Sequence, residues 1–334
     1  MSKGLLRRAA SALRRRWRDR FGPIAQPAPE QRFRSDQIDE LVRIYAADGH
    51  AEGGRWEPFR HAHMELPDWF QRGLDPWSPA YAAQQHRLWQ LIAGVDGPYD
   101  PVRHEVEFGW ADVDPIRAPG FFMRRDPLAI VAASDHVLAT GMLLRHCGLR
   151  AGQRALEYGA GFGQSALALA RLGVEVDTVD ISAKFCEFVQ RQGDHFQVPL
   201  RAHQGRFGEH PRPEIGAYDL IWFYESFHHC VDFIEVVPRI VANLAPEGRI
   251  ILAGEPIVET EYAAVPYPWG VRLHSEVAAV MRHTRWFELG FSEAFLYELF
   301  ARSGLQGRRV ECEPSQFGRL YIFERAPPNP PQDT

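Results

Sequence analysis

The sequence is poor in cysteine and lysine and lacks any long apolar run. Four of its 334 residues are cysteines, and no two of them form a CxxC pair, which argues against a disulfide framework or a zinc ribbon. Lysine occurs only at Lys3 and Lys184, so arginine carries nearly all the positive charge. No apolar stretch is long enough to span a bilayer, and arginines interrupt the segment where a secretory signal needs its apolar core. These absences predict a cytoplasmic protein with reduced thiols.

The overall composition is that of a folded chain with no general affinity for nucleic acid. A hydrophobic fraction of 45% and an aromatic fraction of 12% suffice for a substantial core. The formal net charge is -5, and basic residues form no cluster suited to phosphate contacts outside the N-terminus. We therefore expect a small-molecule or saccharide partner and no nucleic acid.

The N-terminal residues 1–22 form the one strongly basic segment. Leu6, Ala10, Leu13 and Trp17 fall near one face of a helical wheel, with arginines around the rest. This pattern is typical of an amphipathic helix on an anionic membrane surface, but a disordered basic tail and a mitochondrial presequence also fit it. The segment therefore predicts peripheral membrane contact as one of three alternatives.

The rest of the chain divides into an accessory region and an α/β domain. After a proline-rich linker that ends at residue 34, residues 35–128 combine two predicted helices with a loop-rich stretch of Trp, Pro and His. Residues 129–325 alternate helix and strand, which predicts a parallel sheet covered on both faces. Residues 255–290 interrupt this alternation and are predicted to form a lid. The proline-rich tail, 326–334, is predicted to be disordered.

The predicted elements of the α/β domain follow from apolar periodicity and from turn residues. The helices are predicted at 132–146, 162–172, 182–192, 233–244 and 292–303. The strands are predicted at 154–158, 174–180, near 200, 218–224, 249–254, 309–312 and 319–324.

A glycine-rich loop carries the strongest functional signal. Gly159, Gly161 and Gly163 follow a predicted strand and open a predicted helix, where glycine allows a tight turn and a close approach by a ligand. The next strand ends in Asp180, about 20 residues further on, where an acid can bind ribose hydroxyls. Glu157 precedes the glycines. Its charge repels a pyrophosphate but suits a ligand with an ammonium or sulfonium group.

The loop resembles motif I of the class I S-adenosylmethionine-dependent methyltransferases, particularly those that act on small molecules and glycans. The similarity extends from about residue 130 to residue 325, with Asp180 after the second strand and the sequence YDLIWFYESFHH in place of the fourth-strand motif. It implies a Rossmann-like, seven-stranded, mostly parallel sheet whose last strand is antiparallel. It also implies S-adenosylmethionine as the cofactor.

The resemblance further implies which residues bind the cofactor. The glycine loop would line the methionine part, the residues after the second strand would hold the ribose, and those after the third strand would border the adenine. The implied residues are Glu157, Gly159, Ala160, Gly161, Gly163, Asp180, Ile181, Gly205, Arg206, Phe207 and Tyr224.

The acceptor side is predicted from position alone. Candidate bases should follow the fourth strand, at the carboxyl edge of the sheet, and Glu225, His228 and His229 do so. Packing is the alternative for each histidine. The predicted acceptor-binding residues are Glu255, Tyr267, Trp269 and His274. The isolated pair His61 and His63 is weak as a metal motif, and we expect no metal.

The functional hypothesis is methyl transfer to a small-molecule or glycan-like acceptor, with O-methylation favoured. A natural-product or quinone-like acceptor is a second possibility within the same chemistry. Two alternatives come from other classes: a non-catalytic S-adenosylmethionine-binding partner of a larger assembly, and an NAD-binding Rossmann oxidoreductase. The fourth-strand sequence lacks the (N/D)PP(Y/F) pattern, which disfavours methylation of nucleic-acid bases.

Overall fold

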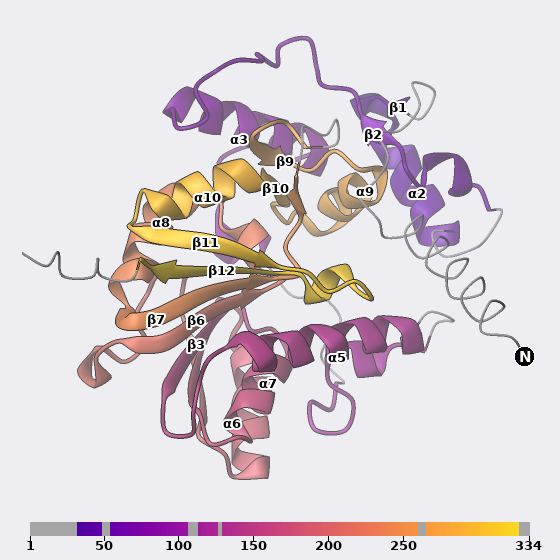
Figure 1. Cartoon of the computed structure of the whole chain (residues 1–334). Helices are drawn as coiled ribbons and strands as arrows, with labels where there is room; N and C mark the ends of the chain where they lie inside the picture. The colour runs from indigo at the N-terminus through magenta and orange to yellow at the C-terminus, as the bar shows by residue number, and fades with distance from the viewer. Residues whose placement is uncertain (1–31, 49–53, 106–112, 126–128, 260–264, 327–334) are drawn as a thin grey trace, which may run out of the picture. The chain divides into compact units, whose positions relative to one another are not determined.

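The computed structural model describes residues 32–48, 54–105, 113–125, 129–259 and 265–326 (Figure 1). These residues pack into two compact units. The first combines the chain up to Gly97 with Val258–Arg285, and the second combines Pro98–Ile257 with the chain from Trp286 onward. No helix among the described residues is both long and apolar enough to cross a membrane. The basic segment 1–22 and nearly all of the tail lie outside the described residues, so both remain predictions.

The two units divide the chain differently from the predicted domains. Residues 98–128 are predicted to belong to the accessory region, whereas the described residues among them pack with the second unit. Residues 255–290 are predicted to be an insertion in the α/β domain, whereas Val258–Arg285 packs with the N-terminal part of the chain. The reason is that long-range packing, rather than the change in local pattern, determines which segments share a core.

The second unit is built on a seven-stranded sheet in the order β11-β12-β7-β6-β3-β4-β5 (Figure 1). All neighbouring strands are parallel except β12, which is antiparallel to both β7 and β11. This confirms the predicted mostly parallel sheet with an antiparallel last strand. The strands are β3 (Arg154–Tyr158), β4 (Glu175–Asp180), β5 (Leu200–Gln204), β6 (Tyr218–Tyr224), β7 (Leu244–Ala253), β11 (Leu305–Val310) and β12 (Leu320–Arg325).

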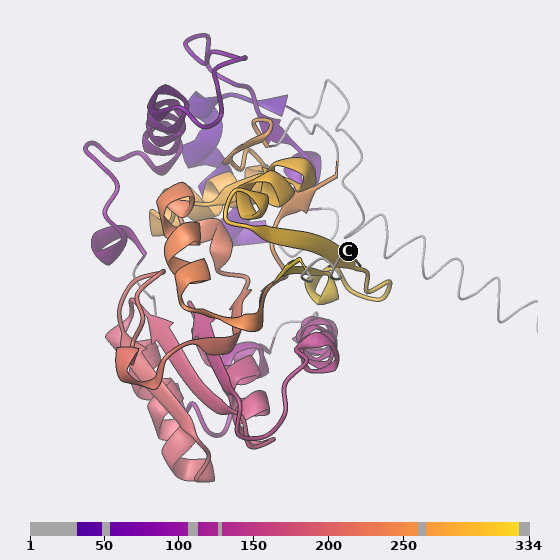
Figure 2. The ribbon, with the colours of Figure 1, turned by 60° about the vertical axis from the view of Figure 1, so that its left-hand side comes forward.

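Helices cover both faces of this sheet (Figures 1 and 2). Three of them, α5, α6 and α7, lie on one face, and α8 and α10 lie on the other. Their bounds are α5 (Ala129–His146), α6 (Gln164–Ala170), α7 (Ala183–Phe196), α8 (Phe233–Ala242) and α10 (Glu293–Ala301). Ser182 and Ser292 cap α7 and α10, because each hydroxyl accepts the backbone N–H three residues on.

The central strands are buried on both faces, as parallel strands between two helical layers must be. Leu220, Trp222, Ile251 and Ile322 have no exposed surface and pack in one apolar core. Leu156 on β3 faces Ile221 on β6 in the strand register. Residues 218–224 are largely apolar, and for this reason the predicted strand matches β6 at both ends.

Several local predictions differ from the structure, among them those for β7, β11 and the helix α9 (Ser275–Thr284); β11 begins at Leu305, before the strand predicted at 309–312. β7 begins at Leu244, five residues before the predicted strand, and the preceding helix ends at Ala242. The Pro-Glu-Gly sequence at 246–248 resembles a turn, but Leu244 already pairs with Tyr218, and an irregular register follows. The helix α9 lies in the segment predicted as a lid and was not predicted as a helix.

The first unit is mainly helical. Its helices are α2 (Ile38–Asp48), α3 (Pro79–Ala93) and α9, and both α2 and α3 pack against α9. Ser78 caps α3, with Pro79 at the first helical position, as predicted. The short strands β1 (Arg32–Phe33) and β2 (His63–Met64) pair in parallel. Among the other short elements, β9 (Trp269–Val271) belongs to the first unit, α4 (Pro101–His104) and β10 (Leu289–Ser292) belong to the second, and β8 (Ile257–Val258) contains the residue at which the chain passes from one to the other.

Two helical glycines of the second unit allow a matched test of its packing. A Cβ atom at Gly193 on α7 would lie 2.7 Å from the carbonyl oxygen of Leu200, whereas one at Gly141 on α5 would meet nothing within 4 Å. We expect Gly193→Ala to lower the free energy of unfolding by about 1–3 kcal/mol through overpacking. We expect Gly141→Ala to raise it by about 0.5–1 kcal/mol, because alanine favours helix. Urea unfolding of both variants measures the difference, and equal effects would contradict the packing described.

Candidate active site

The turn between β3 and α6 contains three glycines with positive φ angles. The angles are 68° at Gly159, 51° at Gly161 and 64° at Gly163. A Cβ atom at Gly159 would lie 2.6 Å from the Cβ of Ser226, and one at Gly163 would lie 2.6 Å from a methyl group of Val189. A Cβ atom at Gly161 would meet nothing within 4 Å. The outer glycines are therefore required for packing, and the middle one faces open space that a ligand can enter.

Asp180, the last residue of β4, binds this turn directly. One of its carboxylate oxygens accepts the backbone N–H of Gly161 at 3.0 Å, and the other accepts that of Ser182 at 2.9 Å. The side chain is 8% exposed. The acid predicted to hold a ribose thus lies beside the open face of the turn, within reach of a ligand placed there.

Glu157 is buried inside the sheet, next to the turn. Its Oε1 accepts the indole N–H of Trp222 at 2.8 Å and also accepts the hydroxyl of Ser165. Its Oε2 has no hydrogen-bond partner among the described residues. Burial raises the pKa of this carboxyl group to about 8. A ligand that carries a positive charge or donates a hydrogen bond would complete this site, as the sequence predicts.

The other residues predicted to bind the cofactor follow β3, β4 and β5 at the same edge of the sheet. The N–H of Gly205 donates to the carbonyl of Asp180 at 3.0 Å, which joins the third-strand loop to the second strand. Phe207 contacts the rings of Tyr158 and Phe223, with centroid distances of 6.1 and 5.4 Å. The other residues of the predicted set are Ala160 in the glycine turn, Ile181 directly after β4 and the exposed Arg206 after β5.

A second group gathers where β6 ends. Tyr224 is the last residue of β6, and Glu225 follows it with a φ of 50°, which is unusual for a residue with a side chain. The Nδ1 of His136, on α5, hydrogen-bonds to the hydroxyl of Tyr224 and lies 3.6 Å from the Glu225 carboxylate. Phe121 stacks on the His136 ring at 4.6 Å. Burial lowers the pKa of His136 to about 4, so this imidazole is neutral at pH 7.

His136 was missed by the sequence analysis, although the helix that carries it was predicted. Nothing in the local pattern of α5 distinguishes His136 from a core residue. Only the sheet brings it beside Tyr224, which is 88 residues away in the chain.

The two predicted histidines after β6 belong to a buried carboxylate cluster. The Nδ1 of His228 lies 2.8 Å from Glu255, whose carboxylate also accepts the backbone N–H groups of Ser226, Phe227 and His228. Burial opposes ionisation of Glu255, but His228 and these donors nevertheless lower its pKa. The Nδ1 of His229 lies 3.3 Å from Glu105.

The charge state of His229 does not suit the role predicted for it. Burial lowers its pKa, but the Glu105 carboxylate outweighs burial and raises it to about 9. A histidine that is already protonated at neutral pH cannot accept a proton from an acceptor. Its role as a general base therefore stays a prediction.

The three predicted acceptor-binding residues of the lid all belong to the first unit. The ring of Trp269 packs on Tyr81 at 4.9 Å, and its indole N–H donates to the carbonyl of Pro76 at 2.9 Å. His274 precedes α9 and is partly buried, and desolvation lowers its pKa to about 3. Tyr267 is 47% exposed. Trp269 and His274 thus pack within their own unit, and their contact with an acceptor stays a prediction.

Comparison with known proteins agrees with this geometry. Residues 156–252 match the family model described as a methyltransferase domain. The chain is similar to the 27-O-demethylrifamycin SV methyltransferase of Amycolatopsis mediterranei, with 30% identity over 131 residues that cover 38% of this chain and 45% of that protein. It is also similar to the ubiquinone biosynthesis O-methyltransferase of Xanthomonas oryzae pv. oryzae, with 23% identity over 48% of this chain and 73% of that protein.

Among solved structures, the geranyl diphosphate C-methyltransferase of Streptomyces coelicolor aligns with 75% of this chain and 100% of its own, at 16% identity and a TM-score of 0.47. The rifamycin relative is matched over less than half of its length. Residues 156–252 match a methyltransferase domain, and the sheet has the strand arrangement that the resemblance implies, so both findings agree with the resemblance seen in the sequence.

The raised pKa of Glu157 predicts a pH-dependent stability. The pKa of Glu157 is about 8 in the folded chain against 4.5 ordinarily, so the protonated carboxyl group stabilises the folded state. This stabilisation is fully present below pH 4.5 and is lost as the pH rises through about 8. Glu157→Gln removes this titration. We expect the variant to gain stability relative to the wild type between pH 5 and pH 8.5. Urea unfolding at both pH values measures the gain, with the exposed Glu247→Gln as control; a gain that is independent of pH would refute the assignment.

Proposed function

We propose that this chain transfers a methyl group from S-adenosylmethionine to a small-molecule acceptor. The observation that carries this proposal is the open face at Gly161, whose backbone N–H binds the carboxylate of Asp180, together with the buried carboxyl group of Glu157 two residues before the turn. S-adenosylmethionine supplies a methyl group bound to a positively charged sulfur. A site with two carboxyl groups and no Cβ atom in the way suits such a ligand better than it suits a dinucleotide with a pyrophosphate.

Each residue of the turn has a separate task in this proposal. Asp180 would bind the ribose hydroxyls of the cofactor while it holds the turn through the N–H of Gly161. Glu157 would face the cationic end of the ligand. Phe207, packed on the rings of Tyr158 and Phe223, would border the adenine.

The proposed acceptor is a small molecule with a hydroxyl group. Two relatives of this chain are named for O-methylation or for an O-demethylated substrate, and both substrates are small molecules. The glycan-like acceptor suggested by the aromatic N-terminal region has no such support. O-methylation of a small molecule is therefore the better-supported form of the hypothesis.

Glu225 is the proposed proton acceptor for that hydroxyl. Its side chain is 33% exposed, whereas His228 is nearly buried and both of its ring nitrogens face carboxylates. Glu225 follows β6, the strand paired with β3, so it lies at the same edge of the sheet as the glycine turn. The neighbouring His136, neutral at pH 7, would orient the Glu225 carboxylate or the hydroxyl of Tyr224.

Substitution at Gly161 tests the cofactor site. Gly161→Arg would fill the open face of the turn, so we expect it to abolish the binding of S-adenosylmethionine measured by calorimetry. Gly304→Arg is the matched control, because Gly304 also has a positive φ and an open surrounding but lies after α10. The control should bind as the wild type does. Unchanged binding by Gly161→Arg would place the site elsewhere, and binding of NAD in place of S-adenosylmethionine would favour an oxidoreductase.

Substitution at Glu225 tests the acceptor side. The assay incubates the chain with labelled S-adenosylmethionine and a host-cell extract, and mass spectrometry identifies the labelled products. We expect Glu225→Gln to lower the rate of labelling about 10²–10⁴-fold while it leaves cofactor affinity nearly unchanged, because a general base acts only in the transition state. Glu247→Gln should label at the wild-type rate. Full activity of Glu225→Gln would show that another group takes the proton, and cofactor binding without any labelled product would favour a non-catalytic binder.

A further inference from the structure

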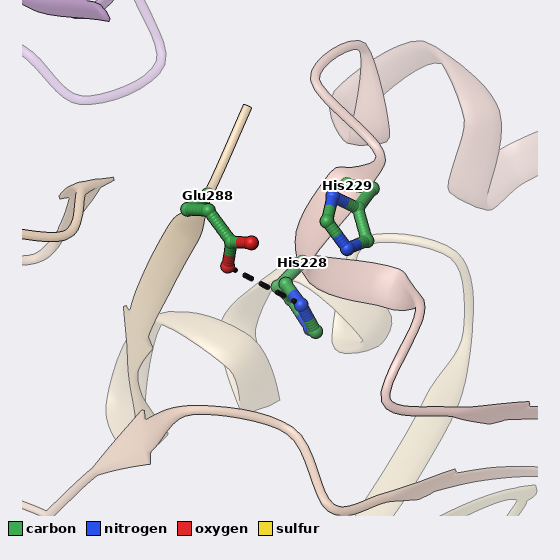
Figure 3. Close-up of side chains that lie close together, drawn as sticks. All are labelled: His228, His229 and Glu288. Carbon is green, nitrogen blue, oxygen red and sulfur yellow. Dashed lines mark ion pairs between the residues drawn. The ribbon is translucent and has the colours of Figure 1, made fainter. Parts of the chain in front are cut away.

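Five ionisable side chains from four segments of the second unit meet around the short helix η5 (Phe227–His229). His228 and His229 come from η5, Glu255 follows β7, Glu288 precedes β10, and Glu105 follows α4. The candidate ligand atoms of His228, His229 and Glu288 all lie within 4.8 Å of one another. Figure 3 shows the three side chains turned toward a common point. The sequence predicted no metal on the grounds that the isolated pair His61 and His63 is a weak motif, and the cluster at η5 was not considered there.

We propose that His228, His229 and Glu288 bind a divalent transition-metal ion such as Zn²⁺. Two ligand atoms on one zinc ion, each about 2.0–2.2 Å from it, lie at most roughly 4 Å apart. Small rotations of side chains that already lie within 4.8 Å of one another are therefore enough to complete the site. Three protein ligands also leave a coordination position for water or for an acceptor oxygen, as in catalytic zinc sites.

Carboxylates outside this set hold both imidazoles in a suitable orientation. Glu255 lies 2.8 Å from the Nδ1 of His228, so the proton of that ring belongs on Nδ1. The Nε2 of His228 is then a lone-pair donor, and it points toward Glu288 at 3.5 Å (Figure 3). Glu105 lies beside the other ring, 3.3 Å from the Nδ1 of His229, which is within ion-pair distance. A histidine that contacts a carboxylate through one nitrogen and a metal through the other is common in metal sites.

Glu105 is itself held in place by two donors. Its Oε1 accepts the hydroxyl of Tyr99 at 2.6 Å and the backbone N–H of Phe287 at 2.8 Å. Glu288 directly follows Phe287. The contact at Phe287 therefore links the carboxylate that orients His229 to the segment that supplies the third ligand.

The charge of the cluster favours a divalent cation. Glu105, Glu255 and Glu288 carry one negative charge each when ionised, a total of three against two imidazoles that are neutral in a metal site. Burial of such an excess is costly unless positive charge compensates it. A divalent ion supplies that charge at the centre of the cluster. Protonation of His229 is the alternative to a metal ion, and it would supply part of the compensating positive charge.

The ligand types distinguish between classes of metal. Imidazole nitrogen suits zinc, iron, nickel and copper, whereas Mg²⁺ and Ca²⁺ prefer oxygen ligands. Two nitrogens and one carboxylate therefore predict tighter binding of Zn²⁺ or Co²⁺ than of Mg²⁺.

The test measures metal binding directly, without cofactor or acceptor. The full chain, free of any histidine tag, is stripped with a chelator, dialysed and titrated with Zn²⁺, and the bound metal is measured. We expect one tight equivalent, a visible spectrum on substitution with Co²⁺, and far weaker binding of Mg²⁺. A wild-type chain that binds no Zn²⁺ above background would overturn the proposal and would favour the protonated cluster. Because S-adenosylmethionine binding is measured separately, that result would leave the proposed function intact.

Variants locate the bound ion. We expect His229→Asn and Glu288→Gln each to remove the tight equivalent, and Glu105→Gln to weaken it about 10–100-fold through the orientation of His229. His195→Asn, on the exposed face of α7, is the matched control and should bind as the wild type does. Circular dichroism checks that each variant is folded. The Co²⁺ spectrum is recorded on the wild type and therefore does not depend on the folding of any variant. Zn²⁺ binding by folded His229→Asn and Glu288→Gln with wild-type affinity would exclude this site.

Discussion

The short turn between β3 and α6 requires two residues without a Cβ atom. Gly159 packs against Ser226, and Gly163 packs against Val189, at distances that no Cβ atom tolerates. These contacts bring the end of β3 close to the segment after β6 and to α7. Asp180 then closes the turn from β4 through the N–H of Gly161. The open face at Gly161, on which the proposed function rests, is a consequence of this packing.

The same packing connects the cofactor site to the histidine cluster. The hydroxyl of Ser226 donates to the carbonyl of Tyr158 at 2.8 Å, and the N–H of Ser226 donates to Glu255 at 2.9 Å. One residue therefore links the end of β3 to the carboxylate that orients His228.

The extent to which the sequence predicted the fold depended on the kind of signal. β3 and β6 were predicted with the observed bounds: β6 is largely apolar, and β3 is a short segment that ends directly before the glycine turn. The start of β7 at Leu244 was missed, since the Pro-Glu-Gly sequence at 246–248 resembles a turn and the pairing with Tyr218 is set by the neighbouring strand. The helix α9 was missed as well, because its stability depends on packing against α2 and α3.

The sequence by itself determined the class of the domain, the order of its elements and the glycine turn with Glu157 and Asp180. These features depend on residues that are close in the chain, where periodicity and turn chemistry act directly. Only the tertiary structure decided which groups surround His136, His228 and His229. Their carboxylate and hydroxyl partners come from segments tens of residues away, and the pairing forms because strands and helices bury a common core rather than because of any local pattern.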